Sequence, residues 1–338
     1  MTNTDTNDTA ASVAQTERIA AAGGEIVRLT AQGRREAENL GAIRAELDRR
    51  GCRVPLVADI HFLPSAALVA AEHVEKIRIN PGNFNDKGGQ FDELLAICKR
   101  RGAALRIGVN HGSLAPAVME RYGDTPEGMV ASAMEFLRRC RAAAFDRVVL
   151  SVKSSNVRVM VQAYRMLAAA MRAEEMRYPL HLGVTEAGND REGRIKSAAG
   201  IGALLADGLG DTIRVSLTEA PEREIPVARM LADYFSGREN HAPIPAVDES
   251  LYSPYSYRKR PSEKIGGIGG DAQVAIWSEI PAAVRETLFE ADIRTVDRIP
   301  RGRIVLLKTN NLNGIAEQRA ALLTMAGRGL TNPVIIQR

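Results

Sequence analysis

Cysteine is scarce in this sequence, and its spacing excludes two common uses of the residue. The three cysteines, Cys52, Cys98 and Cys140, lie more than 40 positions apart. This spacing gives neither an even disulfide framework nor a C-x-x-C metal pair. We therefore expect a reducing, cytoplasmic compartment and no metal site built from these cysteines.

Long apolar runs and charge of a single sign are also lacking. No stretch of 18 apolar residues occurs, and the start MTNTDTNDTA has no basic region followed by an apolar core. We therefore expect neither a membrane span nor export. Lys and Arg number 45 against 41 Asp and Glu, without a basic tract, so a nucleic-acid partner is not expected. With 338 residues, 45% of them hydrophobic, the chain is typical of a globular protein of about two domains.

Two kinds of apolar segment alternate along the first two thirds of the chain. Runs rich in Val, Ile and Leu predict strands at 25–30, 54–60, 75–80, 104–110, 147–153, 179–185 and 211–217. Segments with a 3.6-residue apolar period predict helices at 7–22, 34–50, 63–73, 89–101, 128–144, 156–176, 191–207 and 224–236. This α/β pattern predicts a (β/α)8 TIM barrel, which usually has about 250 residues. An open doubly wound sheet is the alternative. Because the pattern starts with a helix, we expect the barrel to lack its first strand.

The remaining sequence predicts a linker and a second region. We expect residues 1–238 to form the barrel and 239–264, rich in Pro, Ser, Tyr and charge, to be a linker. Residues 265–338 again alternate between strand-like runs (QVAIW, RIVLLKT, PVIIQ) and helical segments. We expect them to be part of a second α/β domain that is incomplete here.

Polar residues lie where the predicted strands end, which is the active-site edge of a barrel. They are Asp59, His61, Arg78, Asn80, Asn110, His111, Lys153, Ser155, Glu186 and Ser216. Arg106 and Arg214 lie inside the strands, where a buried cation is costly unless it meets an anion. Together these cations predict a pocket for a phosphorylated or diphosphate substrate. The alternative for each arginine is an ion pair within the barrel.

Several strings in these regions resemble one enzyme family, the 4-hydroxy-3-methylbut-2-enyl diphosphate synthases. The strings are VADIHF at 57–62, KIRINPGN at 76–83, RIGVNHGSL at 106–114, SVKSS at 151–155, HLGVTEAG at 181–188 and GLGDTIRVSLTEAP at 208–221. NHGSL and the tail strings IGGIGGD, KTNNLNGIAEQRA and NPVIIQR resemble the large form, which carries an additional domain after the barrel.

The resemblance implies reductive ring opening of 2-C-methylerythritol 2,4-cyclodiphosphate, with loss of water, in isoprenoid biosynthesis. Two electrons would come from flavodoxin or ferredoxin through a 4Fe-4S cluster. In the family this cluster is held by a C-terminal domain with three Cys and a Glu, which we expect to be absent from this chain. A homodimer is the expected assembly.

The resemblance also implies roles for individual residues. The diphosphate would bind to Arg78, Arg106, Asn110, Lys153, Arg214 and Ser216. Asn80, His111 and Ser155 are further candidate substrate-binding residues from their position at the strand ends. Glu186 would act as an acid or proton relay, and Asp59 and His61 would line the same rim as further candidate catalytic residues. Two other functions remain open from the residues: a non-catalytic diphosphate-binding module, and a redox-free lyase or transferase with Lys153 as a Schiff-base former.

Overall fold

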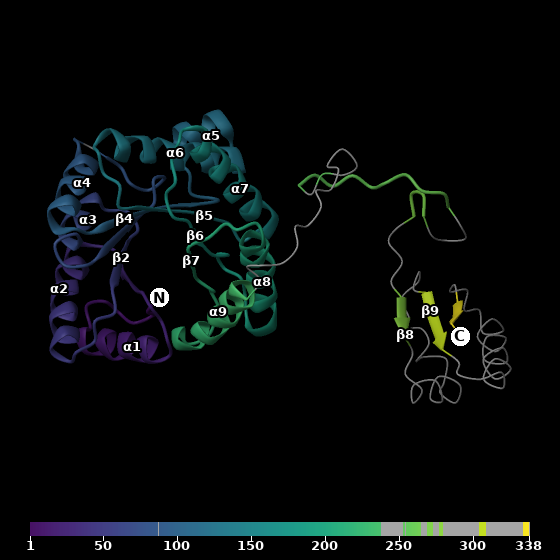
Figure 1. Cartoon of the computed structure of the whole chain (residues 1–338), viewed down its shortest axis with the longest axis horizontal. Coiled ribbons are helices and arrows are strands. Elements are labelled where there is room, and N and C mark those ends of the chain that lie inside the picture. Colours follow the sequence, from purple (N-terminus) through teal and green to yellow (C-terminus); the bar gives the residue numbers. More distant parts are fainter. Residues whose placement is uncertain are drawn as a thin grey trace. The chain divides into compact units, whose positions relative to one another are not determined.

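The chain divides into two units, Met1–Asp248 and Glu249–Arg338 (Figure 1). The structure, a computed structural model, describes residues 1–86, 88–237, 253, 255–264, 269–272, 277–279, 304–308 and 334–337. The first unit holds all the predicted site residues.

Parallel strands form the centre of the first unit. Five of them, paired in chain order, are β1 (Val27–Ala31), β2 (Leu56–Ile60), β3 (Lys76–Ile79), β4 (Ala104–Asn110) and β5 (Val148–Lys153). Two further strands, β6 (His181–Leu182) and β7 (Thr212–Ile213), pair with each other, and a bridge from Leu150 to Leu180 joins them to β5. Strand order follows chain order without a crossover. This is the order of a barrel, whereas a doubly wound sheet reverses direction at a switch point.

Helices surround these strands on the outside (Figure 1). They are α1 (Thr9–Ala21), α2 (Arg34–Arg49), α3 (Pro64–Ala70), α4 (Gln90–Arg101), α5 (Pro116–Tyr122), α6 (Pro126–Ala142), α7 (Val157–Ala173), α8 (Asp190–Ala206) and α9 (Pro221–Ser236). The first and last contact each other, with Arg18 Nε 3.2 Å from Glu222 Oε1. The sequence patterns therefore place these helices correctly except α5, which they do not predict.

Local chemistry explains where several helices begin. Asp8 accepts a hydrogen bond from the Ala11 amide at the start of α1, and Thr125 accepts one from the Gly128 amide at the start of α6. Such side chains satisfy amides that have no partner within the helix. The unpredicted α5 starts with Pro116, which is favoured in a first turn, and ends at Gly123. Its seven residues are too few for a clear apolar period.

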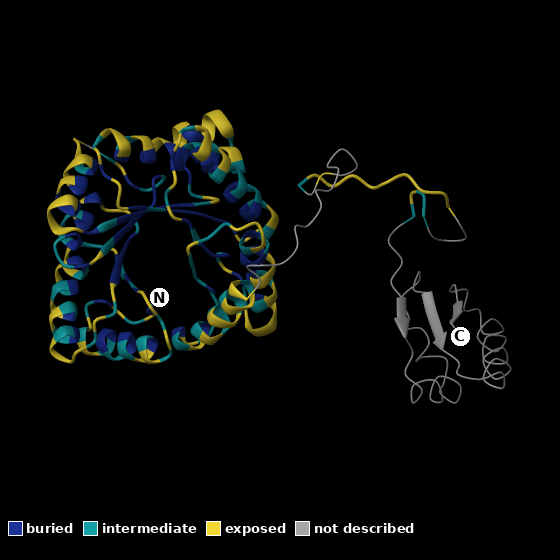
Figure 2. Ribbon diagram, in the orientation of Figure 1, coloured by how far each residue is buried: buried dark blue, intermediate teal, exposed yellow. Residues whose placement is uncertain are grey.

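The core of the unit fills the space between strands and helices. All five residues of β2 are buried, and the buried positions of β1 alternate with partly exposed ones. Figure 2 shows buried residues along the strands and on the inner faces of the helices, with exposed residues on the outer faces. The continuous burial of β2 is typical of a parallel strand covered on both sides.

The barrel has a seam between β1 and β7, which do not pair within the described residues. The first residues of the chain lie along the β1 side of it. The Thr2 amide donates to the Arg28 carbonyl at 2.9 Å, and the Thr6 hydroxyl donates to the Thr30 carbonyl at 2.6 Å. The predicted strands 179–185 and 211–217 are correspondingly reduced to two-residue ladders, which corrects their predicted length.

Three short parallel strands are described in the second unit. They are β8 (Trp277–Glu279), β9 (Ile304–Lys308) and β10 (Val334–Gln337), with β9 in the middle. The runs RIVLLKT and PVIIQ contain the last two of these strands, and QVAIW ends where β8 begins. The helices predicted between them lie outside the described residues. No helix in the described ranges is long and apolar enough to cross a membrane.

Candidate functional site

A cluster of cations lies inside the barrel. It consists of Arg28 on β1, Arg78 on β3, Arg106 on β4, Lys153 at the end of β5 and Arg214 directly after β7. Arg78, Arg106 and Lys153 are buried, and Arg28 and Arg214 are partly buried. We call these five side chains the cation cluster. Only anions or hydrogen-bond acceptors can compensate charge at this depth.

Asp59 on β2 is the carboxylate nearest to the middle of the cluster. Its Oδ1 accepts a hydrogen bond from Arg78 Nη1 at 3.0 Å, and its Oδ2 lies 3.5 Å from Arg28 Nε. His61 Nε2 is also 3.5 Å from Oδ2. Burial alone would raise the pKa of Asp59, but Arg28, a hydrogen bond from His61, Arg78 and Arg106 hold it well below its ordinary value. Asp59 is therefore ionised, and both of its carboxylate oxygens already contact neighbouring cationic or hydrogen-bonding side chains.

Glu224 on α9 is the second carboxylate of this interior. Its Oε2 lies 3.7 Å from Arg214 Nε, and its Oε1 accepts a hydrogen bond from the Leu217 amide at 3.0 Å. The residue is buried, so it holds Arg214 and the segment after β7 against α9. Asp59 and Glu224 together balance at most two of the five cations.

Arg106 and Lys153 have no carboxylate partner among the described residues. Arg106 Nη1 donates to the Ser151 hydroxyl at 3.0 Å, which is neutral. Burial lowers the pKa of both groups well below their ordinary values, and the neighbouring guanidinium groups lower it further. For Arg28, burial lowers the pKa to about 10, although Asp59 opposes this. The interior thus carries excess positive charge, which suits an anion with several oxygens.

Two loops at the carboxyl ends of β3 and β4 are tied together. Asn80 Nδ2 donates to the Ser113 hydroxyl at 2.9 Å, and Asn80 Oδ1 accepts from the Gly82 amide at 3.2 Å. With its amide oxygen turned toward Arg78, Asn110 accepts from Nη2 at 3.2 Å. The loops are therefore connected to each other, and Asn110 connects them to the cation cluster.

Four predicted site residues lie at the margin. Glu186 and Ser155 are exposed, and Ser216 is half-buried. His111 is held by Asp124, with Nδ1 3.5 Å from Oδ2 and Nε2 3.2 Å from the backbone oxygen. Within the described residues, no hydrogen bond or ion pair joins these four side chains to the cation cluster. The structure thus brings together Asp59, His61, Arg78, Arg106, Asn110, Lys153 and Arg214.

Sequence reasoning missed two members of this interior, Arg28 and Glu224. Arg28 has the same signal as Arg106, because it is an arginine inside the apolar strand VRLTA. Glu224 has no such signal, since it lies in the first turn of a helix, where acidic residues are common.

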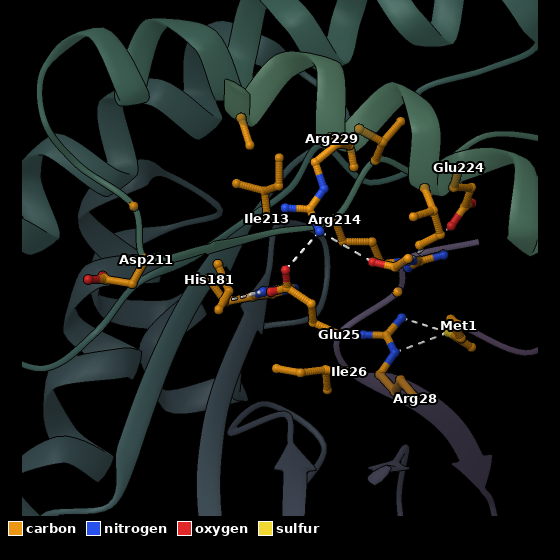
Figure 3. A pocket seen from close by; sticks show the side chains of 18 of the residues that line it. Met1, Glu25, Ile26, Arg28, His181, Asp211, Ile213, Arg214, Glu224 and Arg229 are labelled. Carbon is orange, nitrogen blue, oxygen red and sulfur yellow. Dashed lines mark hydrogen bonds and ion pairs between the residues drawn. The ribbon is translucent and has the colours of Figure 1, made fainter. Parts of the chain in front are cut away.

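A cavity of about 390 Å³ opens at the seam and reaches the cation cluster from the amino ends of the strands (Figure 3). Lys76, His181 and Thr212, which line it, lie at or next to the first residues of β3, β6 and β7, and Arg28, Arg106 and Arg214 line its inner part. His181 Nδ1 lies 2.9 Å from the Thr212 hydroxyl, and burial keeps its pKa well below the ordinary value. The cavity therefore gives a second access to the same cations. It lies at the amino ends of the strands, opposite the predicted active-site edge at their carboxyl ends.

The cysteines do not form a metal site within the described residues. Cys98 on α4 and Cys140 on α6 are buried, and burial raises the pKa of each thiol to about 12. No group of three or more His, Cys, Asp or Glu side chains in this part of the chain is arranged to hold a metal ion. A cluster that requires several thiolates does not fit these residues.

Comparisons with known proteins all match this chain to one enzyme family. Residues 1–229 match the family model of the GcpE TIM-barrel domain. The 4-hydroxy-3-methylbut-2-en-1-yl diphosphate synthase (flavodoxin) of Parabacteroides distasonis is 43% identical, over all of this chain and 69% of its own length. The protein of the same name from Porphyromonas gingivalis is 42% identical, over all of this chain and 68% of its own. The one from Bacteroides fragilis is 56% identical, over 79% of this chain and 46% of its own, so the chain spans about half of that relative.

Proposed function

Because the chain belongs to the GcpE family, we propose that its barrel is the substrate-binding domain of a 4-hydroxy-3-methylbut-2-en-1-yl diphosphate synthase. The substrate would be 2-C-methylerythritol 2,4-cyclodiphosphate. In the whole enzyme its ring is opened by two electrons and a hydroxyl is lost as water, which yields the open-chain diphosphate. The alternative of a non-catalytic diphosphate-binding barrel shares the same anion site and differs only in the absence of turnover.

The observation that carries this proposal is the imbalance of charge inside the barrel. Asp59 and Glu224 are engaged by Arg78, Arg28 and Arg214, whereas Arg106 and Lys153 have no anion. A ring diphosphate supplies two negative charges and several acceptor oxygens in a compact shape. It would satisfy the guanidinium groups through charge-assisted hydrogen bonds.

The polar residues at the mouth have positioning and proton roles in this proposal. Asn110 and Ser216 would contact the diphosphate, and Asn80, His111 and Ser155 would be further substrate-binding residues of the same edge. Glu186, on the loop after β6, would carry a proton to the departing hydroxyl. Its backbone φ is +50°, a left-handed conformation that is uncommon outside glycine and that clusters at functional sites.

The redox chemistry belongs to residues that this chain does not supply within its described part. Cys98 and Cys140 are buried, and these thiols do not fit an iron–sulfur cluster. We propose that a 4Fe-4S cluster is held by a further domain with three Cys and a Glu, and that flavodoxin or ferredoxin delivers the electrons. The names of the relatives support flavodoxin.

The proposal extends to the linker, the second domain, the cellular compartment and the assembly of the whole enzyme. Residues 239–264 would link the barrel to residues 265–338, which would be part of an additional α/β domain. The whole enzyme would work in the cytoplasm as a homodimer.

Calorimetric titration with the cyclic diphosphate tests the anion site directly. Arg106→Ala should weaken binding by about 10- to 150-fold, since a hydrogen bond to a charged group contributes about 1.5 to 3 kcal/mol. Arg34→Ala is the matched control, because Arg34 lies on α2 and pairs with Glu38 in solvent. Equal affinity of the two variants would show that Arg106 has only a structural role and would contradict the proposed site.

A further inference from the structure

Lys153 is the member of the cation cluster that carries an amine, whereas the other four carry guanidinium groups. It is buried at the carboxyl end of β5. It lies against the backbone at Gly183, where an added Cβ would be only 2.7 Å from Nζ. No hydrogen bond or ion pair to its amine is found among the described residues. The described part of the protein therefore supplies none of the three acceptors that an ammonium group has in water.

Charged groups from every neighbouring element surround this amine, and most of them are cations. They are Arg28 on β1, Arg78 on β3, Arg106 on β4, Arg214 after β7, His181 on β6 and the amino terminus at Met1. The buried carboxylates of the barrel interior are Asp59 on β2 and Glu224 on α9. Both carboxylates already contact arginines. Lys153 therefore meets repulsion without a compensating anion of its own.

Guanidinium and amine groups differ in how easily they lose a proton, and this difference singles out Lys153 in the cation cluster. A guanidinium stays charged in proteins, whereas a lysine amine loses its proton readily when it is buried. Burial lowers the pKa of Lys153 well below the ordinary value, and the four guanidinium groups lower it further. Lys153 is therefore the group that can relieve the excess charge of the empty site.

We propose that Lys153 is a neutral amine in the ligand-free barrel and takes up one proton when a diphosphate binds among the arginines. Anion binding is thereby coupled to proton uptake. The inference rests on the proposed function, because it requires a diphosphate in the cation cluster. It adds that the charge of the site adjusts to the charge of its occupant.

This coupling has a defined dependence on pH. A diphosphate supplies the missing anion, so the bound state favours the ammonium form of Lys153. At pH values between those at which the free and the bound amine titrate, binding consumes a proton. Affinity then falls by about tenfold per pH unit as pH rises. Below that window the amine is already charged, and the slope disappears.

Calorimetry with inorganic pyrophosphate on the full 338-residue chain measures the uptake. Heats are compared at pH 8 in two buffers of different ionisation enthalpy, which gives the number of protons bound. Wild type should take up about one proton more than Lys153→Met or Lys153→Arg, because neither variant has a titrating amine there. Lys196→Met, which removes an exposed lysine paired with Glu192 on α8, should behave as wild type. Pyrophosphate is itself partly protonated at pH 8, and its own proton release depends on the charge of the site. Lys153→Arg keeps a cation at this position, so the comparison of wild type with this variant separates the titration of Lys153 from that of the ligand.

His181 and the amino terminus are the other groups that could take up the proton. Both remain in Lys153→Met, and His181→Gln removes the first. If the extra proton persists in Lys153→Met or disappears in His181→Gln, the proton does not belong to Lys153 and the inference is wrong. If pyrophosphate and the cyclic diphosphate fail to bind wild type at all, the proposed anion site is wrong, and the coupling falls with it.

A second measurement needs no ligand and uses a variant only to assign one signal. The sequence has eight lysines, so ¹³C-labelled lysine side chains give a simple spectrum, in which Lys153→Met identifies one signal. In the free chain this signal should show a neutral amine at pH 8. An ammonium signal for Lys153 at pH 8 would overturn the inference even if pyrophosphate binds.

Discussion

Asp59 is the residue at which several cations of the barrel interior meet. It accepts a hydrogen bond from Arg78 at 3.0 Å and lies 3.5 Å from both Arg28 and His61. Breaking a buried ion pair by removing one partner is far more costly than the pair's net contribution, because the other charge stays buried. In this barrel more than one charge would be left.

Asp59→Asn should therefore lower the free energy of unfolding by about 3 to 5 kcal/mol at pH 7. The carboxylate has a lowered pKa in the folded chain, so it stabilises the fold at pH values above its unfolded pKa of about 3.9. That contribution is lost as pH falls through the folded pKa. Urea unfolding at pH 7 and at about pH 3.5 should show the difference between wild type and variant shrinking in acid.

Asp48→Asn is the control for this experiment. Asp48 lies on α2, is partly exposed and pairs with Arg44 at 2.9 Å and Arg53 at 3.3 Å. Exposed pairs of this kind contribute about 0.2 to 1 kcal/mol. Similar losses in the two variants at pH 7 would show that Asp59 is not the anchor of the interior charges.

Glu186 has a left-handed backbone conformation, which a glycine at this position would adopt more easily than a glutamate. Its φ of +50° costs a residue with a Cβ about 1 to 2 kcal/mol, whereas glycine adopts it freely. Glu186→Gly should leave thermal stability unchanged or raise it slightly, since the unfolded-state entropy of glycine offsets part of the relief. Glu186→Gln should melt as wild type. A marked loss of stability in both variants would mean that the side chain stabilises the loop, which would weaken its proposed proton role.

The elements that position the carboxyl-end edge of the barrel are two loop segments, 80–86 and 111–115. Asn80 and Ser113 are hydrogen bonded across them at 2.9 Å. Behind the first loop, the guanidinium of Arg139 on α6 lies 4.5 Å from the ring centre of Phe91 and 2.7 Å from Asp86 Oδ2. The loop is thus fixed at both ends, from the site by Asn80 and from the helix layer by Arg139.

Gly82→Ala tests how closely the two loops must approach. A Cβ at Gly82 would lie 1.8 Å from the Ser113 carbonyl oxygen, so the loops must separate. We expect a lower melting temperature and weaker binding of the cyclic diphosphate, because Asn110 follows the movement of the second loop. Gly202→Ala on α8 is the control, as its Cβ would meet the Phe235 ring at 3.5 Å, an ordinary contact. Unchanged affinity in Gly82→Ala would separate the loop contact from binding.

The sequence predicts elements well where burial is continuous. The ranges of β2, β4 and β5 agree with the apolar runs to within two residues. It predicts them poorly where pairing decides the length, because 179–185 and 211–217 have the same apolar character but form only short ladders beside the seam. Hydrophobic pattern records burial, whereas strand length also depends on a neighbour in space.

The candidate site shows the same division. An arginine in an apolar strand identifies Arg78 and Arg106 from sequence alone, and the same rule would have identified Arg28. It cannot reveal that Glu224, about 200 positions later, faces the same interior, or that His111 is held by Asp124. The first of these arrangements arises from closure of the helix ring, which brings α9 beside β1, and the second from the fold of the loop after β4.

The molecule as a whole is nearly balanced in charge, but its charges are not evenly placed. The net formal charge is +4. By formal charge the five side chains of the cation cluster exceed Asp59 and Glu224 by three, and by two when Lys153 is neutral. Much of the imbalance is therefore concentrated inside the first unit. Exposed charge is screened by salt more strongly than buried charge, so binding of an anion here should weaken with ionic strength without being abolished.

Binding of an anion in the interior should also stabilise the whole first unit, and the cysteines can report it. Cys98 and Cys140 are buried on α4 and α6, and burial raises the pKa of both thiols to about 12, while Cys52 is partly exposed. A thiol reagent at pH 8 should modify Cys52 quickly, and Cys98 and Cys140 only when the unit opens. Labelling of the buried pair should slow by about 100-fold at a pyrophosphate concentration 100 times Kd, because a ligand that binds only the folded state stabilises it by about 2.7 kcal/mol.

Cys52 serves as the internal control, since its rate should not change. If binding is seen by calorimetry but labelling of Cys98 and Cys140 is not slowed, the anion binds away from the core that these helices enclose.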